Sequence, residues 1–155
     1  MIDKRIQCSQ DVYLKQMQFE IESLFGRRCF NEVSAICTQI EERYHPTITQ
    51  FFVFHHALAE MFLRHYDDAK SAFKKLLRDQ FLPEVYRFHI AYNLCLIAGY
   101  ARKRGECWRY LEETACSAET SDQLILAQNL RCKFFQLHGD FRRLELTVLD
   151  DNLSS

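Results

Sequence analysis

Cysteines and histidines are the residues of this sequence with the greatest capacity for chemistry. Six histidines stand at positions 45, 55, 56, 65, 89 and 138, and seven cysteines at positions 8, 29, 37, 95, 107, 116 and 132. Their spacing matches neither a zinc site nor a His-Glu-x-x-His motif. His56 and Glu60 are four residues apart on one predicted helix, and we interpret this pair as structural or incidental. The sequence therefore predicts no metal site.

A nucleophilic enzyme would need a nucleophile, a base and a recognisable local setting. The pair formed by Cys95 and His89 lacks any local signature, and the chain has no phosphate loop, Gly-x-Ser-x-Gly elbow or Rossmann fingerprint. We therefore predict that the protein is not an enzyme and uses no cofactor. The contrary hypothesis, an enzyme on a helical scaffold, predicts lost activity with a retained fold when Cys95, Cys107 or His89 is replaced.

The cysteines also indicate a compartment. Their odd number and their place in helix-patterned segments argue against the disulfide framework of a small secreted protein. The N-terminus has no apolar segment of a signal peptide, and no apolar run approaches the roughly 18 residues of a membrane span. We expect free thiols that act as small core residues in a reducing compartment, the cytoplasm, with the nucleus as an alternative.

Composition excludes several further classes of protein. The chain has 155 residues, which allows one domain or a small array rather than two independent cores. Only 4 Gly and 2 Pro are present, fewer than the turns of a sandwich or barrel require, and a hydrophobic fraction of 48% excludes intrinsic disorder. Because the net charge is -1, no bulk field attracts nucleic acid or an anionic membrane, and neither is expected as a partner.

The elements that position these residues are all predicted to be helices, because apolar residues recur at three- and four-residue spacing. Short connections containing Gly, Pro, Ser or Thr separate the periodic segments. The sequence predicts eight helices, over residues 11–25, 30–40, 51–63, 66–77, 83–103, 108–115, 124–137 and 141–149. No segment reads as a strand. The helices follow one another as helix–turn–helix pairs.

The second helix of each pair opens in a similar way. If Phe30, Tyr66, Cys107 and Phe141 are equivalent, the repeat spacings are 36, 41 and 34 residues. Two helices in a period near 34 residues are typical of tetratricopeptide repeats. Residues 64–77 resemble the second helix of such a repeat, with Tyr66, Ala69 and Phe73 in register, and the Gly-Asp-aromatic sequence at 139–141 resembles its usual entry. Pro46 and Pro83 stand where that family often ends a repeat.

We number the four predicted helix pairs as repeat units one to four. Departures from the family pattern are concentrated in the first and the last of them. The family has a small residue where paired helices approach closely. Repeat units two and three have Ala57 and Ala98 at this position, whereas units one and four have Ile21 and Cys132. Tyr110 replaces the expected small residue in unit three. The resemblance implies an all-α fold of about four antiparallel hairpins stacked as a short right-handed α-solenoid. We expect this domain to cover 11–150, with an N-terminal extension at 1–10 and a C-terminal tail at 151–155.

By the family register, the first helix of each pair lines a concave groove that binds a partner. Unit two contributes apolar residues to this predicted groove, namely Phe51, Phe54, Leu58, Met61 and Phe62. The other units contribute Lys15, Gln18, Glu22, Phe25, Tyr92, Cys95, Gly99, Arg102, Lys103, Leu126, Asn129, Lys133 and Gln136. Some members of the family bind a C-terminal carboxylate with Lys, Asn and Arg residues at fixed groove positions. In this sequence only a few of those positions carry such residues. A partner helix or extended apolar segment therefore fits better, although the same aromatic residues could be core.

Basic residues recur at the turns between paired helices, among them Arg27, Arg28 and Arg104. Cations there complement the helix dipole, which accounts for most of the pattern. We hypothesise in addition that these residues form a basic edge that meets an acidic segment of a partner.

These patterns predict a non-enzymatic scaffold or adaptor that binds a helix or peptide segment of another protein, as a subunit of a complex. The alternative is a tetratricopeptide-like secretion chaperone that holds an aggregation-prone client. The helix at 51–62 could equally be a self-association surface, so a homodimer and a hetero-complex are both compatible with the sequence.

Overall fold

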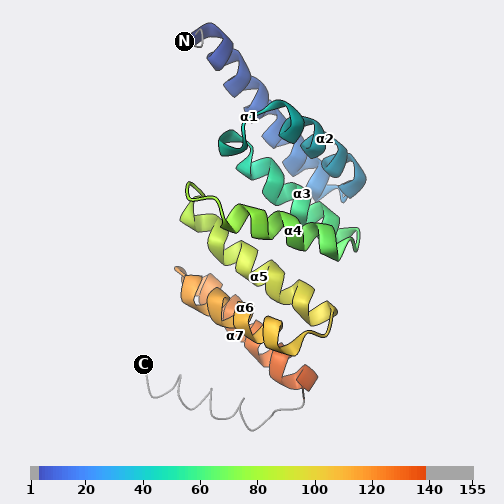
Figure 1. Ribbon diagram of the computed structural model, residues 1–155, viewed down its shortest axis with the longest axis vertical. Coiled ribbons are helices and arrows are strands. Elements are labelled where there is room, and N and C mark those ends of the chain that lie inside the picture. The colour runs from blue at the N-terminus through green and yellow to red at the C-terminus, as the bar shows by residue number, and fades with distance from the viewer. Residues whose placement is uncertain (1–3, 139–155) are drawn as a thin grey trace. The chain divides into compact units, whose positions relative to one another are not determined.

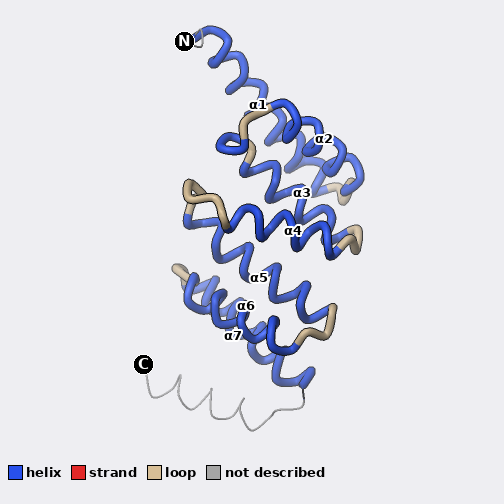
Figure 2. Tube along the Cα trace, in the orientation of Figure 1, coloured by secondary structure: helices blue, strands red, loops and turns tan. Residues whose placement is uncertain are grey.

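The computed structural model describes residues 4–138, and within this range the chain is helical without any strand. Within residues 4–138, seven α-helices are joined by short loops (Figures 1 and 2). Their bounds are α1 Lys4–Gly26, α2 Phe30–Arg43, α3 Gln50–Phe62, α4 Tyr66–Leu77, α5 Glu84–Tyr100, α6 Arg104–Ser117 and α7 Ser121–His138, with a 3-10 turn η1 at Pro46–Ile48. The all-α prediction is confirmed. None of these helices is long and apolar enough to cross a membrane.

The first helix begins at Lys4, seven residues before the start predicted at Asp11. Much of the predicted extension at 1–10 is therefore helical, because adding a residue to an existing helix needs no new nucleation. The predicted eighth helix, the tail at 151–155 and the repeat position Phe141 lie outside the described residues.

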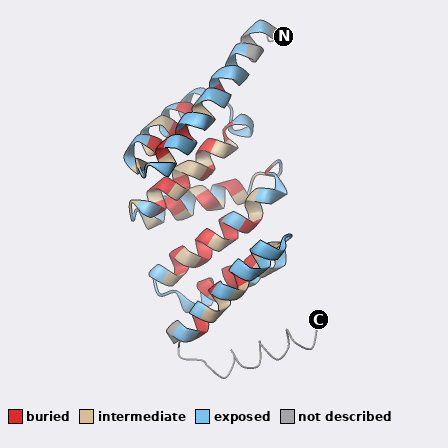
Figure 3. Cartoon of the chain, turned by 180° about the vertical axis from the view of Figure 1, so that it is seen from behind, coloured by how far each residue is buried: buried red, intermediate tan, exposed pale blue. Residues whose placement is uncertain are grey.

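The chain divides into two compact units at the Leu82–Pro83 junction. In the first unit, α3 contacts both helices of the preceding hairpin, α1 and α2, and pairs with α4. In the second unit, α7 contacts both α5 and α6, which form a hairpin. Residues on the faces turned toward neighbouring helices are buried, and the outer faces are exposed (Figure 3). In each unit, the helix that follows a hairpin thus packs on both of its members.

The three hairpins are closed by the same backbone turn. Among the described residues, Arg28, Arg64 and Arg102 are the non-glycine residues with positive φ, at 60°, 66° and 57°. Each donates its N–H to the carbonyl three residues earlier at 3.0–3.1 Å, and the next residue donates to the carbonyl five residues before it at 2.8–2.9 Å. This pair of bonds is the Schellman motif, which satisfies the last carbonyls of a helix.

Alignment of the three hairpins on these turns gives a register that differs from the predicted one. Two residues after each left-handed arginine stand Phe30, Tyr66 and Arg104, so the spacings are 36 and 38 residues. Cys107 is not the equivalent of Phe30, and the small partner of Ala57 in the third hairpin is Cys95 rather than Ala98. Buried residues recur at equivalent positions of the three hairpins in this register. The sets of equivalent residues are Ile21, Ala57 and Cys95; Val33, Ala69 and Cys107; Cys37, Phe73 and Leu111; and Ile40, Leu76 and Thr114.

Candidate functional site

Glu60 breaks the apolar pattern that the three hairpins share. The equivalent residues four positions before the left-handed arginine are Leu24 and Ala98, and both are buried. In the second hairpin this position holds a carboxylate whose side chain is only 14% exposed. A charged group in such a place needs hydrogen-bond partners, because its desolvation is otherwise unfavourable. Departures of this kind from a repeat mark candidate functional positions.

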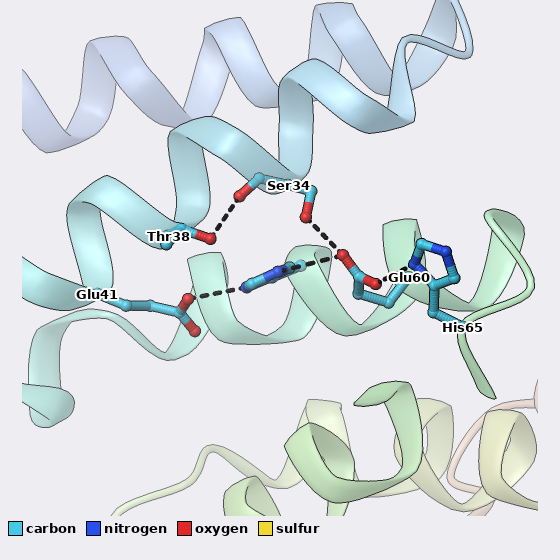
Figure 4. Close-up of polar contacts among 6 residues, drawn as sticks. Ser34, Thr38, Glu41, Glu60 and His65 are labelled. Carbon is cyan, nitrogen blue, oxygen red and sulfur yellow. Dashed lines mark hydrogen bonds and ion pairs between the residues drawn. The ribbon is translucent and has the colours of Figure 1, made fainter. Parts of the chain in front are cut away.

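Two helices and a turn supply the partners of Glu60 (Figure 4). Ser34 of α2 donates its hydroxyl proton to Oε1 at 2.5 Å, and Nδ1 of His65 lies 2.6 Å from Oε2. His56 is held between two carboxylates, with Nδ1 2.8 Å from Glu41 Oε2 and Nε2 3.5 Å from Glu60 Oε1. We call these five residues, Ser34, Glu41, His56, Glu60 and His65, the carboxylate network.

The network shifts the titration of two of its members in opposite directions. Burial acts to raise the pKa of Glu60, but hydrogen bonds from Ser34 and His65 and the nearby imidazoles outweigh it, so this pKa is lowered. The hydrogen bond to Glu41 raises the pKa of His56 against the opposing effect of burial. Both shifts therefore favour the charged form of the group at the contact between α2 and α3.

This geometry holds helices together and does not form a nucleophile. Ser34 donates its hydroxyl proton to the Glu60 carboxylate, and the lowered pKa of that carboxylate makes it a weak base for removing the proton. Glu60, His65 and Asp68 offer oxygen and nitrogen atoms within 4.8 Å of one another, the spacing of a potential cation site. The His65–Glu60 bond spans the α3–α4 turn, and Asp68 lies in the first turn of α4, where a carboxylate complements the helix dipole. These roles account for the cluster, and we assign no metal to it.

An aromatic surface lies beside the network at the same contact of α2 with α3. The rings of Phe30 and Phe62 stack with centroids 4.7 Å apart and 9° between their planes. Phe25 at the end of α1 meets both by its edge, at 5.2 Å from Phe30 and 5.9 Å from Phe62. Phe62 is 54% exposed although it belongs to this cluster. We call Phe25, Phe30 and Phe62 the aromatic platform.

Three arginines lie in the two turns next to the platform residues in sequence. Arg27 and Arg28 form the α1–α2 turn, and Arg64 forms the α3–α4 turn, which lies at the same end of the first unit (Figures 1 and 3). All three side chains are exposed. None has a side-chain hydrogen bond or ion pair with another residue in the part of the chain that the structure describes. Arg27 and Arg28, predicted to form a basic edge, are thus available to solvent at the end of the first unit where the Phe62 ring is exposed.

The predicted groove residues of α3 separate into buried and accessible ones. Phe54 and Met61 are 8% and 9% exposed, so they belong to the packed interior and the prediction that they line an open groove is corrected. The edge of Phe54 packs against the ring of Phe73 on α4, with centroids 5.9 Å apart. Phe51 and Leu58 are half-buried, which leaves Phe62 as the exposed member of the set.

The remaining predicted site residues are distributed over the second unit. Arg102 and Lys103 form the exposed turn between α5 and α6, so they are turn residues rather than members of a helix face, and Arg104 begins α6. Tyr92 is half-buried and stacks on Phe88 at 6.1 Å. Exposed positions on α7 are held by Leu126, Asn129, Lys133 and Gln136. A partner site that includes these residues stays a prediction.

The first unit also contains a surface depression of about 590 Å³ between η1 and the end of α4. Charged side chains of both signs line it, among them Glu41, Lys75, Arg78 and Asp79. Asp79 already accepts hydrogen bonds from Gln50 Nε2 at 2.7 Å and from the Phe81 N–H at 2.9 Å. The lining therefore selects no ligand of one charge, and we assign no site here.

Sequence reasoning missed Phe30, Ser34 and Glu60 as a connected set. The signal was present in the repeat, because Glu60 stands where the other hairpins have Leu24 and Ala98. It becomes visible only when the hairpins are aligned on their turns. Comparison with family models, curated proteins and solved structures finds no match to this chain.

Proposed function

We propose that this protein is a non-enzymatic interaction module that binds an acidic segment with aromatic or leucine side chains from a partner protein. The binding surface is the aromatic platform with Arg27, Arg28 and Arg64 around it. The observation that carries the proposal is the exposed Phe62 ring, which is held in place by stacking on Phe30, at the end of the first unit where two turns carry exposed arginines.

The apolar part of the surface can supply useful binding energy. A phenylalanine presents roughly 150–250 Å² of area, of which about half is still exposed at Phe62. Covering that area would contribute about 2–3 kcal/mol at 25 cal/mol per Å². Stacking on Phe30 restricts the ring before binding, so little side-chain entropy remains to be lost. Phe62 is therefore suited to act as an anchor.

The charged part of the surface selects the partner. Three guanidinium groups on two adjacent turns favour carboxylates over cations in a docking segment. Because these groups are exposed, their attraction acts mainly on the rate of association and is screened by salt. An apolar segment without acidic residues would offer the guanidinium groups no carboxylate, so it would gain no electrostatic attraction to this surface.

We also propose that the hairpins are repeats of a tetratricopeptide-like right-handed array. The three identical Schellman turns and the recurring buried positions support this assignment. The second unit repeats part of the binding surface, since Tyr100 is exposed two residues before Arg102 as Phe62 is before Arg64. An array of this kind needs no catalytic chemistry to bind a partner.

A defined peptide tests the proposal. Fluorescence anisotropy would measure binding of the full chain to a labelled peptide of alternating Asp and Phe, with a peptide of alternating Lys and Phe as reference. We expect the acidic peptide to bind more tightly, high salt to weaken binding, and Phe62→Glu to weaken it by about tenfold or more.

The matched control is Phe19→Glu, because Phe19 is 74% exposed on α1 and has no ring contact with the platform. It should leave binding unchanged. Equal loss in both variants, or equal binding of acidic and basic peptides, would show that the platform is not the binding surface.

A further inference from the structure

Two thiols of the second unit face each other across the α5–α6 hairpin. The Sγ atoms of Cys95 and Cys107 are 3.6 Å apart. Each thiol is also directed at the backbone of the other helix, with Cys95 Sγ 3.4 Å from the Cys107 carbonyl oxygen and Cys107 Sγ 3.6 Å from that of Cys95. No other pair of sulfur atoms is in contact among the residues whose side chains the structure describes.

The repeat explains why these two positions meet. They are equivalent to Ile21 and Val33 in the first hairpin and to Ala57 with Ala69 in the second. These are the buried positions at which the paired helices face each other, and a small side chain allows close approach. In the third hairpin both positions carry a thiol. The backbone of the repeat thus brings two sulfur atoms to van der Waals contact without any special loop.

We propose that Cys95 and Cys107 are a redox modification site that closes to an intramolecular disulfide on reaction with a hydroperoxide. A disulfide needs a sulfur–sulfur distance of about 2.05 Å, so the two atoms must approach by roughly 1.5 Å. Rotation of the side chains and a small shift of the two helices supply this distance. The partners are 12 positions apart in sequence, so the new bond ties the end of α5 to the start of α6.

We assign Cys107 as the attacking residue first because it is the more accessible of the two thiols, at 6% exposed against 2% for Cys95. The hydrogen bond from Cys95 lowers the pKa of Cys107 against the effect of burial, and the same contact, together with burial, raises the pKa of Cys95. The Cys107 thiolate attacks one peroxide oxygen, the O–O bond breaks, and the leaving alkoxide takes a proton, which gives a sulfenic acid and an alcohol. Cys95 sulfur then attacks Cys107 sulfur, the S–O bond breaks, and water leaves with the Cys95 proton. Two thiols and one organic hydroperoxide thus give a disulfide, an alcohol and water, and with hydrogen peroxide the leaving group is hydroxide and the alcohol is replaced by a second water.

The other cysteines provide internal references for reactivity. Burial raises the pKa of Cys37 to about 12, so it should remain a thiol during mild oxidation. Cys116 is exposed, has no sulfur neighbour among the described residues, and reports direct oxidation at the surface. Selective loss of Cys95 and Cys107 ahead of Cys116 would follow from the geometry of the pair and not from exposure.

The test uses the full reduced chain treated with hydrogen peroxide, then denatured, alkylated and mapped by mass spectrometry. We expect a single bridge that joins Cys95 to Cys107 within one chain, while Cys37 and Cys116 remain alkylated. The unfolding midpoint should rise by about 5–10 °C, because closing this loop restricts the unfolded chain. Bridges to other cysteines, or oxidation of Cys116 with Cys95 and Cys107 still alkylated, would overturn the proposal.

Two variants test the order of the steps. Cys95→Ala should leave a sulfenic acid on Cys107 that dimedone traps, since the resolving thiol is gone, whereas Cys107→Ala should give no adduct on Cys95. Both variants should fold, because Ala57 and Ala69 occupy the same repeat positions, and circular dichroism checks this. A dimedone adduct on Cys95 in place of Cys107 would refute the assigned roles. The double variant Cys95→Ala with Cys107→Ala should lose the oxidation-dependent rise in the unfolding midpoint.

Discussion

Replacing Glu41 by Gln keeps the shape of the side chain opposite His56 but removes its charge. His56 Nδ1 lies 2.8 Å from Glu41 Oε2, and this hydrogen bond is the largest of the influences that raise the pKa of His56. The second carboxylate, that of Glu60, is farther away at 3.5 Å from Nε2. We therefore expect Glu41→Gln to lower the pKa of His56 substantially.

The effect on stability depends on pH in a direction that follows from the shift. A histidine whose pKa is raised by folding stabilises the folded state fully below its ordinary value of 6.5, and this stabilisation is lost as pH rises through the folded pKa. Glu60, whose pKa is lowered, stabilises the fold above its ordinary value of 4.5 and loses this effect as pH falls through the lowered pKa. The carboxylate network is thus most stabilising between these two ordinary values.

The size of the effect follows from the geometry and exposure of the pair. A hydrogen bond between charged groups contributes about 1.5–3 kcal/mol when it is shielded from water. The side chains of His56 and Glu41 are 22% and 27% exposed, so solvent screening reduces this to about 1 kcal/mol. We expect Glu41→Gln to lower the free energy of unfolding by about this amount near pH 6 and by much less near pH 9.

Urea unfolding across this pH range gives the free energy, and NMR titration of the imidazole signals gives the pKa of His56. Glu42→Gln is the matched control, because Glu42 is the exposed neighbour on α2 and contacts no residue of the network. The reasoning is refuted if His56 titrates at the same pH in the Glu41 variant and the parent protein. It is also refuted if the Glu42 variant loses as much stability at pH 6.

Two further predictions test the assignment of core and turn residues by urea unfolding. Phe54→Ala should lower the free energy of unfolding by about 3–4 kcal/mol, because it leaves a cavity beside Phe73. Phe62→Ala should lower it by less than about 1 kcal/mol, because Phe62 is exposed. Equal losses in the two variants would contradict the assignment of Phe54 to the core. Arg64→Gly should raise the free energy of unfolding by about 0.5–1 kcal/mol by relieving its left-handed conformation, while the control Arg78→Gly, at φ -79°, should not.

Helix type and hairpin order could be predicted because the apolar positions recur with a helical period over many residues. The start of α1 could not, since residues 4–10 are largely polar and show no apolar stripe of helical period, and Ser9 within them is a residue type that would cap a helix starting near Asp11. Glycine or asparagine is the usual residue in a left-handed turn, so arginine at 28, 64 and 102 gave no local sign of the Schellman motif. Without that sign, the aromatic residues that open the second helices had to define the repeat. The third hairpin has Arg104 at the position of Phe30 and Tyr66, so it offers no aromatic residue there.

Local patterning could not separate the buried Phe54 from the exposed Phe62. Both lie on one helix that is apolar nearly all round, so its period does not identify the face that a neighbour covers. That face is set by the packing of α2 and α4 against α3, and such contacts between helices leave no mark in the pattern within α3 itself. The same limit applied to Glu60, whose unusual character depends on a comparison with Leu24 and Ala98 in the correct register.

The carboxylate network and the aromatic platform are parts of one arrangement. On α2, Ser34 lies one helical turn after Phe30, and on α3, Glu60 lies two residues before Phe62. The Ser34–Glu60 bond therefore joins α2 to α3 beside the level at which the two phenylalanine rings stack. A leucine at position 60, as in the first hairpin, would fill the space but would fix neither Ser34 nor His65. The carboxylate thus ties together the two helices whose ends present the exposed aromatic surface, which gives a structural role to a polar group at an otherwise apolar position of the hairpins.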